Sequence, residues 1–188
     1  MEIRQFDHEQ VLALLPDRNA DAHKGNFGKL LLLCGSEGYT GAAALSAMGA
    51  LRCGAGLVYL GVPRSIYAIE AVKLTEPIVF PLPDRDGMLS TQALPKILAM
   101  LGSMDAVLIG PGLGQSEATR AVIRTVLEEA KCPVVLDADG INGICRHMDI
   151  LRERHYPTVL TPHAGEFSRL GGSTAGDRVA VAETFARE

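Results

Sequence analysis

The sequence lacks tryptophan, and aromatic residues make up only 5% of its 188 positions. This scarcity disfavours an aromatic-rich β-sandwich, whereas the abundant Ala, Leu, Val and Gly suit close packing of helices on a sheet. No apolar run reaches the roughly 18 residues that a membrane-spanning helix needs. We therefore expect no membrane partner.

Charge of one sign is not concentrated anywhere along the chain. Eighteen basic residues stand against twenty-two acidic ones, which gives a formal net charge of −4. Because the Lys and Arg residues are scattered, they offer no continuous track for a phosphate backbone. We therefore expect no nucleic-acid partner.

The cysteines lack the spacing of a metal site or of a disulfide framework. Cys34, Cys53, Cys132 and Cys145 include no C-x-x-C pair, and the first residues do not resemble a signal peptide. These features predict buried, reduced thiols in a cytoplasmic protein.

Short apolar runs alternate with helical patterns along the whole chain, and nothing marks a linker. We expect one domain over residues 1–188, opening with a leading helix and loop over 1–20 packed on the outside. Strands are predicted over 30–34, 57–60, 77–80, 106–109, 134–136 and 158–160, and helices over 42–53, 66–71, 91–101, 117–131, 142–152 and 178–187. Helical crossovers between strands predict the α/β class, with a mostly parallel sheet and helices on both faces.

Two glycine-rich loops follow predicted strands and lead into helices. In Gly35–Gly41 and Gly110–Gly114, backbone N–H groups can approach a phosphate with assistance from the helix dipole. Neither loop has the Walker A pattern or the G-x-G-x-x-G pattern. Each alone can also be a tight structural turn, but the pair favours a phosphate-rich ligand.

Titratable side chains follow the last two predicted strands. Asp137 and Asp139 could hold Mg²⁺ through waters or orient a hydroxyl. Alternatively, Asp139 caps the next helix and Asp137 accepts hydrogen bonds from loop amides. Pro162 ends the final strand, and His163 and Glu166 follow it. Ligands bind beyond the carboxyl ends of strands in open α/β sheets, so we favour a site role for His163.

These residues belong to six motifs that occur in order: Lys24–Lys29, Tyr39–Ala43, Ala50–Val58, Gly110–Gly114, Leu136–Asp139 and Thr161–Glu166. Together they resemble the ADP/ATP-dependent NAD(P)H-hydrate dehydratase family, a branch of the ribokinase-like superfamily. The resemblance implies a ribokinase-like fold and a hydro-lyase that repairs hydrated NADH or NADPH using ADP or ATP and Mg²⁺. The implied chemistry transfers a phosphoryl group to the ring hydroxyl, after which the electrons of the ring nitrogen expel phosphate. Positioning and charge neutralisation dominate such catalysis.

The resemblance also implies roles for individual residues. The residues implied to line the hydrated dinucleotide are Gly41, Ala42, Gly112, Gly114 and His163. The residues implied to support a network around phosphate and Mg²⁺, with no direct metal ligand, are Asp137, Asp139 and Glu166.

The chain departs from the family pattern in one respect. Family members continue beyond the position of Glu188 with a Lys-Gly-x-x-Thr loop and a Gly-Ser-Gly-Asp loop, whose aspartate is the expected catalytic base. Neither loop occurs within the 188 residues, so no catalytic residue is assigned. Asp177, in a glycine-rich segment of different spacing, is expected to cap the helix over 178–187.

From this departure we expect a ribokinase-like domain that lacks the C-terminal strands and helices. Little dehydratase activity and weak nucleotide affinity are predicted for the chain by itself. An exposed apolar sheet edge, covered in a homo-oligomer or by a partner chain, is predicted as well.

Two other functions stay open. One is a different ribokinase-like kinase of a small molecule, although Tyr39–Ala43 and His163, where the superfamily usually has Asn, argue against it. The other is a non-catalytic dinucleotide-binding remnant. A Rossmann dehydrogenase is weaker still, because G-x-G-x-x-G and its acidic partner are missing.

Overall fold

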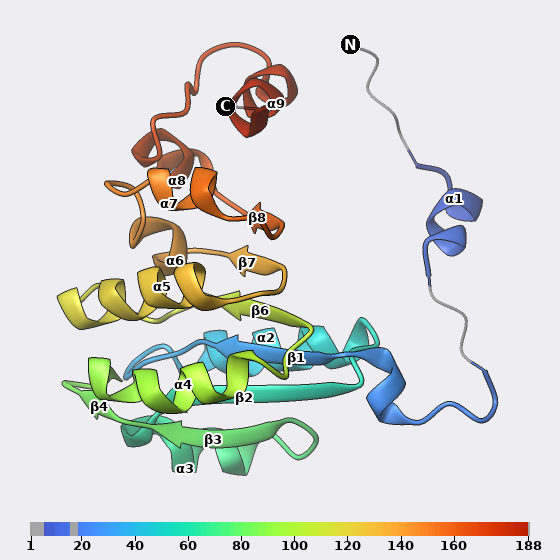
Figure 1. Ribbon diagram of the computed structural model, residues 1–188, viewed down its shortest axis with the longest axis vertical. Helices are drawn as coiled ribbons and strands as arrows, with labels where there is room; N and C mark the ends of the chain where they lie inside the picture. Colours follow the sequence, from blue (N-terminus) through green and yellow to red (C-terminus); the bar gives the residue numbers. More distant parts are fainter. Residues whose placement is uncertain (1–5, 16–18, 188) are drawn as a thin grey trace.

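The computed structural model describes residues 6–15 and 19–187, and its centre is a six-stranded parallel sheet (Figure 1). The strands are β1 (Lys29–Leu33), β2 (Leu57–Pro63), β3 (Ile78–Leu82), β6 (Ala106–Ile109), β7 (Val134–Leu136) and β8 (Thr158–Leu160). Their order is β3-β2-β1-β6-β7-β8, and every neighbouring pair is parallel. All six predicted strands are therefore present, and the α/β class is confirmed.

Helices connect the strands, as the alternating pattern predicts. The α-helices are α1 (His8–Ala13), α2 (Thr40–Arg52), α3 (Arg64–Lys73), α4 (Leu94–Leu101), α5 (Glu117–Glu129), α6 (Asp139–Asn142), α7 (Asp149–Glu153), α8 (Ala164–Arg169) and α9 (Arg178–Arg187). Short 3-10 turns cover Lys24–Phe27 and Thr91–Ala93.

Two parts of the helix prediction are wrong. The single helix expected over 142–152 is replaced by α6, which ends at Asn142, and α7, which begins at Asp149, with turns over 143–146 between them; Gly143 in the first of these turns lies against α5. A Cβ on Gly143 would meet Ile123 Cδ1 at 2.7 Å. The second error is the omission of α8, which occupies what was expected to be a loop.

A small hairpin, β4 (Asp84–Arg85) and β5 (Met88–Leu89), is also absent from the prediction. Its turn has positive φ angles at Asp86 (52°) and Gly87 (73°), the combination that an Asp-Gly hairpin turn needs. Gly87 O accepts a hydrogen bond of 2.9 Å from Glu37 N, so the hairpin is bonded to the first glycine loop.

Side chains of β1 alternate between two apolar layers, one on each face of the sheet. Leu32 and Cys34 belong to the layer under α2 and α3, which Ala43, Ala47 and Ile66 complete. Small residues on α2 let that helix approach the sheet closely. Leu31 and Leu33 belong to the opposite layer, under α4 and α5. Helices therefore cover both faces, as predicted.

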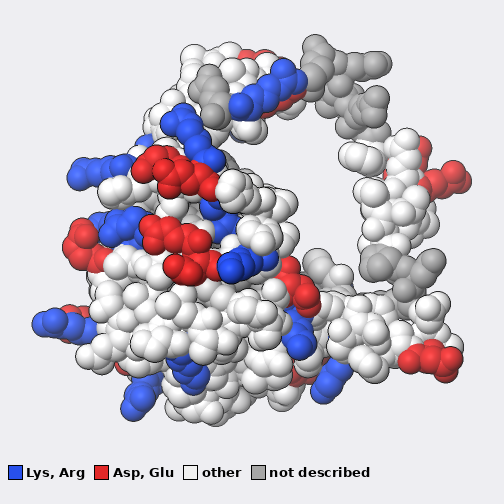
Figure 2. Space-filling view, in the orientation of Figure 1, with Lys and Arg blue, Asp and Glu red and all other residues white. Residues whose placement is uncertain are grey.

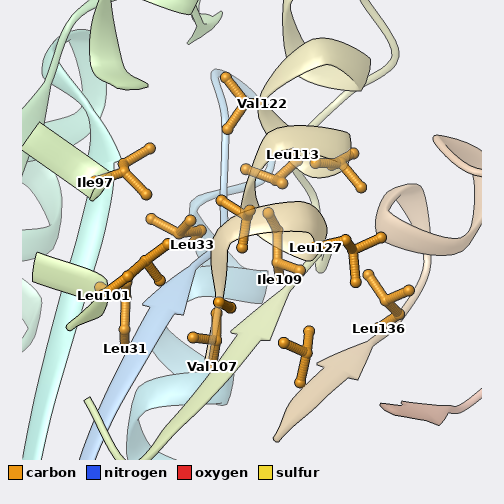
Figure 3. Close-up of a cluster of buried hydrophobic side chains, with 14 of the residues drawn as sticks. Leu31, Leu33, Ile97, Leu101, Val107, Ile109, Leu113, Val122, Leu127 and Leu136 are labelled. Carbon is orange, nitrogen blue, oxygen red and sulfur yellow. The ribbon is translucent and has the colours of Figure 1, made fainter. Parts of the chain in front are cut away.

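The layer under α4 and α5 is the larger core. Figure 3 shows side chains from β1, β6 and β7 meeting those of the two helices, among them Leu33, Ile109, Leu136, Ile97 and Leu127. Each of these is fully buried, and burying such a side chain stabilises the fold by about 1.5–3 kcal/mol. Ser116 caps α5 by accepting a 3.0 Å hydrogen bond from Thr119 N.

The order of strands determines where the loops meet. From β1 the chain moves outward through β2 and β3, then returns to the other side of β1 and moves outward again through β6, β7 and β8. The direction reverses between β1 and β6, and ligands of open α/β sheets bind at such a reversal. The two glycine loops follow these two strands.

The leading segment differs from its prediction. Residues 1–5 and 16–18 of this segment lie outside the described ranges, and the described α1 lies apart from the layered body in Figure 1. None of its residues is buried. For the described part of this segment, the expectation of packing on the outside is therefore wrong, because apolar residues such as Val11, Leu12 and Leu14 remain exposed and belong to neither apolar layer.

No helix in the described ranges is both long enough and apolar enough to cross a membrane. On the face shown in Figure 2, basic and acidic side chains are interspersed over the body of the molecule.

Candidate functional site

The two glycine loops are in direct contact at the reversal between β1 and β6. Gly35 N donates to Pro111 O at 2.8 Å, and Ser36 Oγ donates to Gly112 O at 2.7 Å. Gly112 has φ +64°, and a Cβ at this position would lie 2.9 Å from the Cβ of Ala42. The structure therefore brings together Ala42 and Gly112, which the family resemblance assigns to one pocket.

The start of α2 is anchored from the other side by α3. Lys73 Nζ donates to Thr40 Oγ1 at 2.7 Å and forms a 3.3 Å ion pair with Glu70, whose side chain is fully buried. Gly41 is the next residue and is exposed. The first turn of α2 is thus held in place while Gly41 stays accessible.

The loops after β6 and β7 approach each other even more closely. Gly110 has φ +132°, and a Cβ there would lie 1.8 Å from Asp137 O. Ala138, between the two aspartates, has φ 48°, which is strained for a residue with a side chain. Such strain costs on the order of 1–3 kcal/mol and accumulates at functional sites. The strained turn directs the two carboxylates to different partners.

Asp139 links the loop after β7 to the second glycine loop. Its carboxylate accepts hydrogen bonds from Gly114 N (2.9 Å), Gln115 Nε2 (3.0 Å) and Asn142 Nδ2 (3.3 Å). Ala138 occupies the N-cap position of α6, so the alternative in which Asp139 caps this helix is wrong. Gly114 and Asp139, both predicted site residues, are therefore bonded to each other.

Asp137 connects β7 to β8. Its Oδ1 accepts a 2.8 Å hydrogen bond from Thr161 Oγ1, which is not one of the loop amides that the structural alternative named. The hydroxyl of Thr161 also lies 3.2 Å from Leu136 O. The carboxyl ends of the two strands are thereby held side by side.

His163 and Glu166 form the start of α8. His163 is the N-cap residue, and its Nδ1 accepts hydrogen bonds from Gly165 N (3.0 Å) and Glu166 N (3.4 Å). In return, Glu166 Oε2 accepts a 2.9 Å hydrogen bond from His163 N. This reciprocal arrangement is a capping box, and histidine takes the position that Ser or Thr usually fills.

The same geometry determines the proton arrangement on the imidazole. Because Nδ1 accepts two N–H groups, the proton of the neutral ring resides on Nε2, which lies 3.1 Å from Glu166 Oε1. The Glu166 side chain is 7% exposed and the His163 side chain 67% exposed. The His163 ring is therefore exposed, while the buried Glu166 carboxylate orients it from within.

These groups form a row along the carboxyl edge of the sheet. In the described part of the chain, no hydrogen bond joins His163 or Glu166 directly to a glycine loop. The connection passes through Arg169, whose Nε donates to Asn142 Oδ1 at 2.9 Å, and from Asn142 to Asp139.

Sequence reasoning missed the polar residues that hold this row together, namely Ser36, Gln115, Asn142, Thr161 and Arg169. Thr161 stands inside a recognised motif and could have been found there. Ser36, Gln115 and Arg169 have no spacing signal, since their partners lie 24 or more residues away along the chain. Asn142 bonds to the nearby Asp139 but also to Arg169, 27 residues away.

The thiol of Cys34, directly before the first glycine loop, is buried. Burial raises the pKa of Cys34 to about 12, although a hydrogen bond with the Ser46 side chain opposes the shift. All four cysteines are unpaired, but only Cys34 and Cys132 are buried, so the prediction of buried thiols is wrong for the exposed Cys53.

The described residues contain no group of three or more His, Cys, Asp or Glu side chains arranged to hold a metal ion directly. Asp137 Oδ2 accepts no hydrogen bond from the described residues, whereas both oxygens of Glu166 are engaged by His163.

Beyond His163 the site continues into an apolar groove of about 1180 Å³ between β8, α7, α8 and α9. Its apolar lining includes Leu151, Leu160, Phe167, Leu170 and Phe185. The rings of Phe167 and Phe185 pack edge to face at 5.0 Å and attach α9 to α8. Val159 of the edge strand β8 is 52% exposed, in agreement with the predicted apolar edge.

The first turn of α9 is capped by Asp177, as predicted. Its Oδ1 accepts hydrogen bonds of 2.9 Å from both Val179 N and Ala180 N.

Sequence comparisons identify the family and the relatives of this chain. The family model described as NAD(P)H-hydrate dehydratase matches residues 30–188. The bifunctional NAD(P)H-hydrate repair enzyme of Moorella thermoacetica is 43% identical over 179 residues, which cover 93% of this chain and 34% of that enzyme. The ADP-dependent (S)-NAD(P)H-hydrate dehydratase of Bacillus subtilis is 33% identical over 188 residues, which cover 100% of this chain and 63% of that enzyme. The chain thus spans between a third and two thirds of these relatives.

Solved structures show the same fold. A ribokinase-like superfamily protein of Enterococcus faecalis matches with a TM-score of 0.69 and 25% identity, over 82% of this chain and 51% of that one. An ADP/ATP-dependent NAD(P)H-hydrate dehydratase of Bacillus subtilis, co-crystallised with ATP and Mg²⁺, matches with a TM-score of 0.64 and 33% identity, over 86% and 53%. The fold is ribokinase-like, and the chain belongs to the NAD(P)H-hydrate dehydratase family.

Proposed function

We propose that the carboxyl edge of this sheet binds hydrated NADH or NADPH and serves its dehydration at the expense of ADP or ATP. The observation that supports this most is the continuous row of hydrogen bonds from the glycine loops through Asp139 to α8, built around the reversal of strand order. The relatives' names supply the substrate and the nucleotide.

The residues fall into two groups by their chemistry. The proposed contacts of the dinucleotide are Gly41, Ala42, Gly112, Gly114 and His163. The glycines allow close approach of the backbone, and the exposed His163 ring supplies a flat face and an edge.

The acidic residues form the second group and would act on Mg²⁺ and phosphate. Asp137, Asp139 and Glu166 are spread along the edge rather than clustered, and each already accepts at least one hydrogen bond. This donor set fits Mg²⁺ held through its waters, a mode that this ion favours. Of the three, Asp137 has the freest oxygen and is the proposed outer contact of the ion.

When bound, the nucleotide and Mg²⁺ supply a phosphoryl group that turns the ring hydroxyl into a leaving group. The chain's own contribution is positional. The contacts between the glycine loops would hold the hydrated nicotinamide ring in place at the carboxyl edge of the sheet. The capping box keeps the His163 imidazole in one orientation. Such preorganisation is the main source of catalysis in phosphoryl transfer.

The test is titration of the ¹⁵N-labelled chain with chemically hydrated NADPH. We expect amide shifts confined to residues 35–42, 110–115, 137–142 and 161–166. Ala42→Gln, which fills the space beside Gly112, should weaken binding about tenfold or more. Leu45→Gln is the matched control, because this side chain is 77% exposed on the same helix and should leave affinity unchanged. Shifts elsewhere, or equal effects of the two variants, would contradict the proposal.

Turnover is followed by the near-ultraviolet absorbance of regenerated NADPH in the presence of ADP or ATP and Mg²⁺. Recovery of NADPH supports the dehydratase and contradicts the expectation that this chain by itself has little activity. A phosphorylated product without loss of water supports a small-molecule kinase instead. Binding without any reaction agrees with the expected low activity of the chain by itself, and it is also the outcome expected of a non-catalytic dinucleotide-binding protein.

We further propose that the chain forms a homo-oligomer and acts in the cytoplasm. Support for assembly comes from large apolar side chains exposed on α2, α3 and β8, with Leu45 at 77%, Val72 at 85% and Val159 at 52%. The unpaired cysteines suit a reducing compartment. Multi-angle light scattering that gives the mass of a monomer at high concentration would contradict the assembly.

A further inference from the structure

Arg169 is the basic side chain at the junction between the loops after β7 and β8. It is exposed in the last turn of α8, and its Nη1 lies 3.8 Å from the position that a Cβ on Gly165 would occupy. Side chains on helices lean toward the N-terminus, so the guanidinium extends back toward the first turn of α8. It therefore lies beside the His163–Glu166 capping box.

The acidic groups around Arg169 do not neutralise it. Both oxygens of Glu166 are engaged by His163, and the Asp139 carboxylate is surrounded by donors from Gly114, Gln115 and Asn142. Within the described residues, Arg169 forms no ion pair, and its one hydrogen bond is made by Nε to Asn142. Both Nη atoms are therefore available to an external acceptor.

The partners of Asn142 fix the orientation of its amide, and the amide in turn orients the Arg169 guanidinium. Its amide lies between a carboxylate, which only accepts, and a guanidinium, which only donates. The Nδ2 atom must face Asp139 and the Oδ1 atom must face Arg169, as observed. The plane of the guanidinium is thereby held from its Nε side, with the remaining edge free.

We propose that Arg169 is a phosphate-binding residue of this site and that Asn142 is its positioning residue. The two Nη atoms donate to two oxygens of one phosphoryl group, the bidentate geometry that makes arginine effective toward phosphate. This inference deepens the proposed function, since it names the side chain that receives the phosphate along the edge.

The first test uses the ¹⁵N-labelled chain and inorganic phosphate or pyrophosphate as probes, so that it does not depend on the dinucleotide. The Nε–Hε signal of Arg169 should shift on titration. Arg169→Met should raise the dissociation constant about tenfold or more, because it removes two charge-assisted hydrogen bonds. Arg169→Lys should bind more weakly than the native chain, because an ammonium cannot bind in the bidentate mode.

The matched control is Arg146→Met, which removes the same charge from an exposed position outside the hydrogen-bonded row. The phosphate affinity of this variant should stay within about twofold of the native value, since exposed charges are screened by salt. Equal losses in Arg146→Met and Arg169→Met would show that only net charge matters and would overturn the proposal. So would an unchanged affinity in Arg169→Met.

Asn142→Ala tests the positioning role separately. We expect the Arg169 Nε–Hε signal to lose its native chemical shift and phosphate affinity to fall severalfold, with the Arg169 side chain itself intact. An unaltered Nε–Hε signal would overturn the role of Asn142. Loss of hydrated NADPH binding with retained, Arg169-dependent phosphate binding would instead contradict only the proposed function.

Discussion

Arg154 connects the edge strand of the sheet to the end of α5, and its removal is the most direct test of how the site is supported. Its guanidinium donates to three backbone oxygens near the C-terminus of α5, those of Leu127, Ala130 (3.3 Å) and Cys132 (3.0 Å). Its Nε donates to Thr158 Oγ1 at 3.0 Å. One side chain thus joins the helix end, the entry to β7 and the first residue of β8.

The magnitude follows from these contacts. A hydrogen bond to a charged group contributes about 1.5–3 kcal/mol, whereas ordering an arginine side chain costs up to about 2 kcal/mol. Burial lowers the pKa of the Arg154 guanidinium, which indicates that water only partly reaches it. A positive charge at a helix C-terminus adds a few tenths of a kcal/mol. We expect Arg154→Met to lower the free energy of unfolding by about 2–4 kcal/mol.

Urea denaturation followed by circular dichroism measures this quantity. Arg154→Lys should recover less than half of the loss, because a lysine cannot reach three carbonyls with a planar fork. Lys131→Met is the matched control: it removes an exposed positive charge at the same end of α5 and should change stability by less than about 0.5 kcal/mol. A loss below about 0.5 kcal/mol in Arg154→Met would refute the assignment of Arg154 as the connection.

Two further predictions concern the strand ends. Gly110→Ala should destabilise the chain by about 3 kcal/mol or more, because at φ +132° its Cβ would overlap Asp137 O. The control is Gly102→Ala, whose Cβ meets nothing within 4 Å and which should be nearly neutral. Equal melting temperatures of the two variants would contradict this prediction. Because burial raises the pKa of Cys34 from 9.0 to about 12, its neutral form stabilises the fold below pH 9, and stability should fall as the pH rises from 9 toward 12. Cys34→Ala should reduce this loss of stability at high pH. In the native chain at pH 8, thiol reagents should label the exposed Cys53 and leave Cys34 unlabelled. Rapid labelling of Cys34 would refute the prediction.

Repetitive local patterns made the strands and most helices predictable. A run such as Leu30–Cys34 is apolar on both faces, and only a strand covered by helices on each side buries all of it. The helix over 142–152 was wrong because its apolar pattern continues through residues 143–148, which the structure places between α6 and α7 rather than in a helix. The helix α8 was missed because histidine is a rare N-cap and gives no ordinary start signal.

Candidate site residues were predictable where local backbone geometry defines their place, and not where a distant side-chain partner defines it. Glycines after strands, and carboxylates beyond strand ends, mark a site through the chain's own local geometry. Ser36, Asn142 and Arg169 owe their places to partners 76, 3 and 27 residues away, and the distant pairings have no local signature. The strain at Ala138 is equally invisible, because alanine gives no signal of a positive φ.

The sequence by itself determined the α/β class, the six strands of the sheet and most of the helices between them, and the residue types that could meet a phosphate-rich ligand. Those features depend on the local period of apolar residues and on glycine and proline, which act within a few positions. Only the tertiary structure decided that Asp139 serves the second glycine loop, that Glu166 orients His163, and that Asn142 holds Arg169 through its Nε. Each of these depends on which strand ends become neighbours, and that is settled by packing the whole sheet rather than by any one segment.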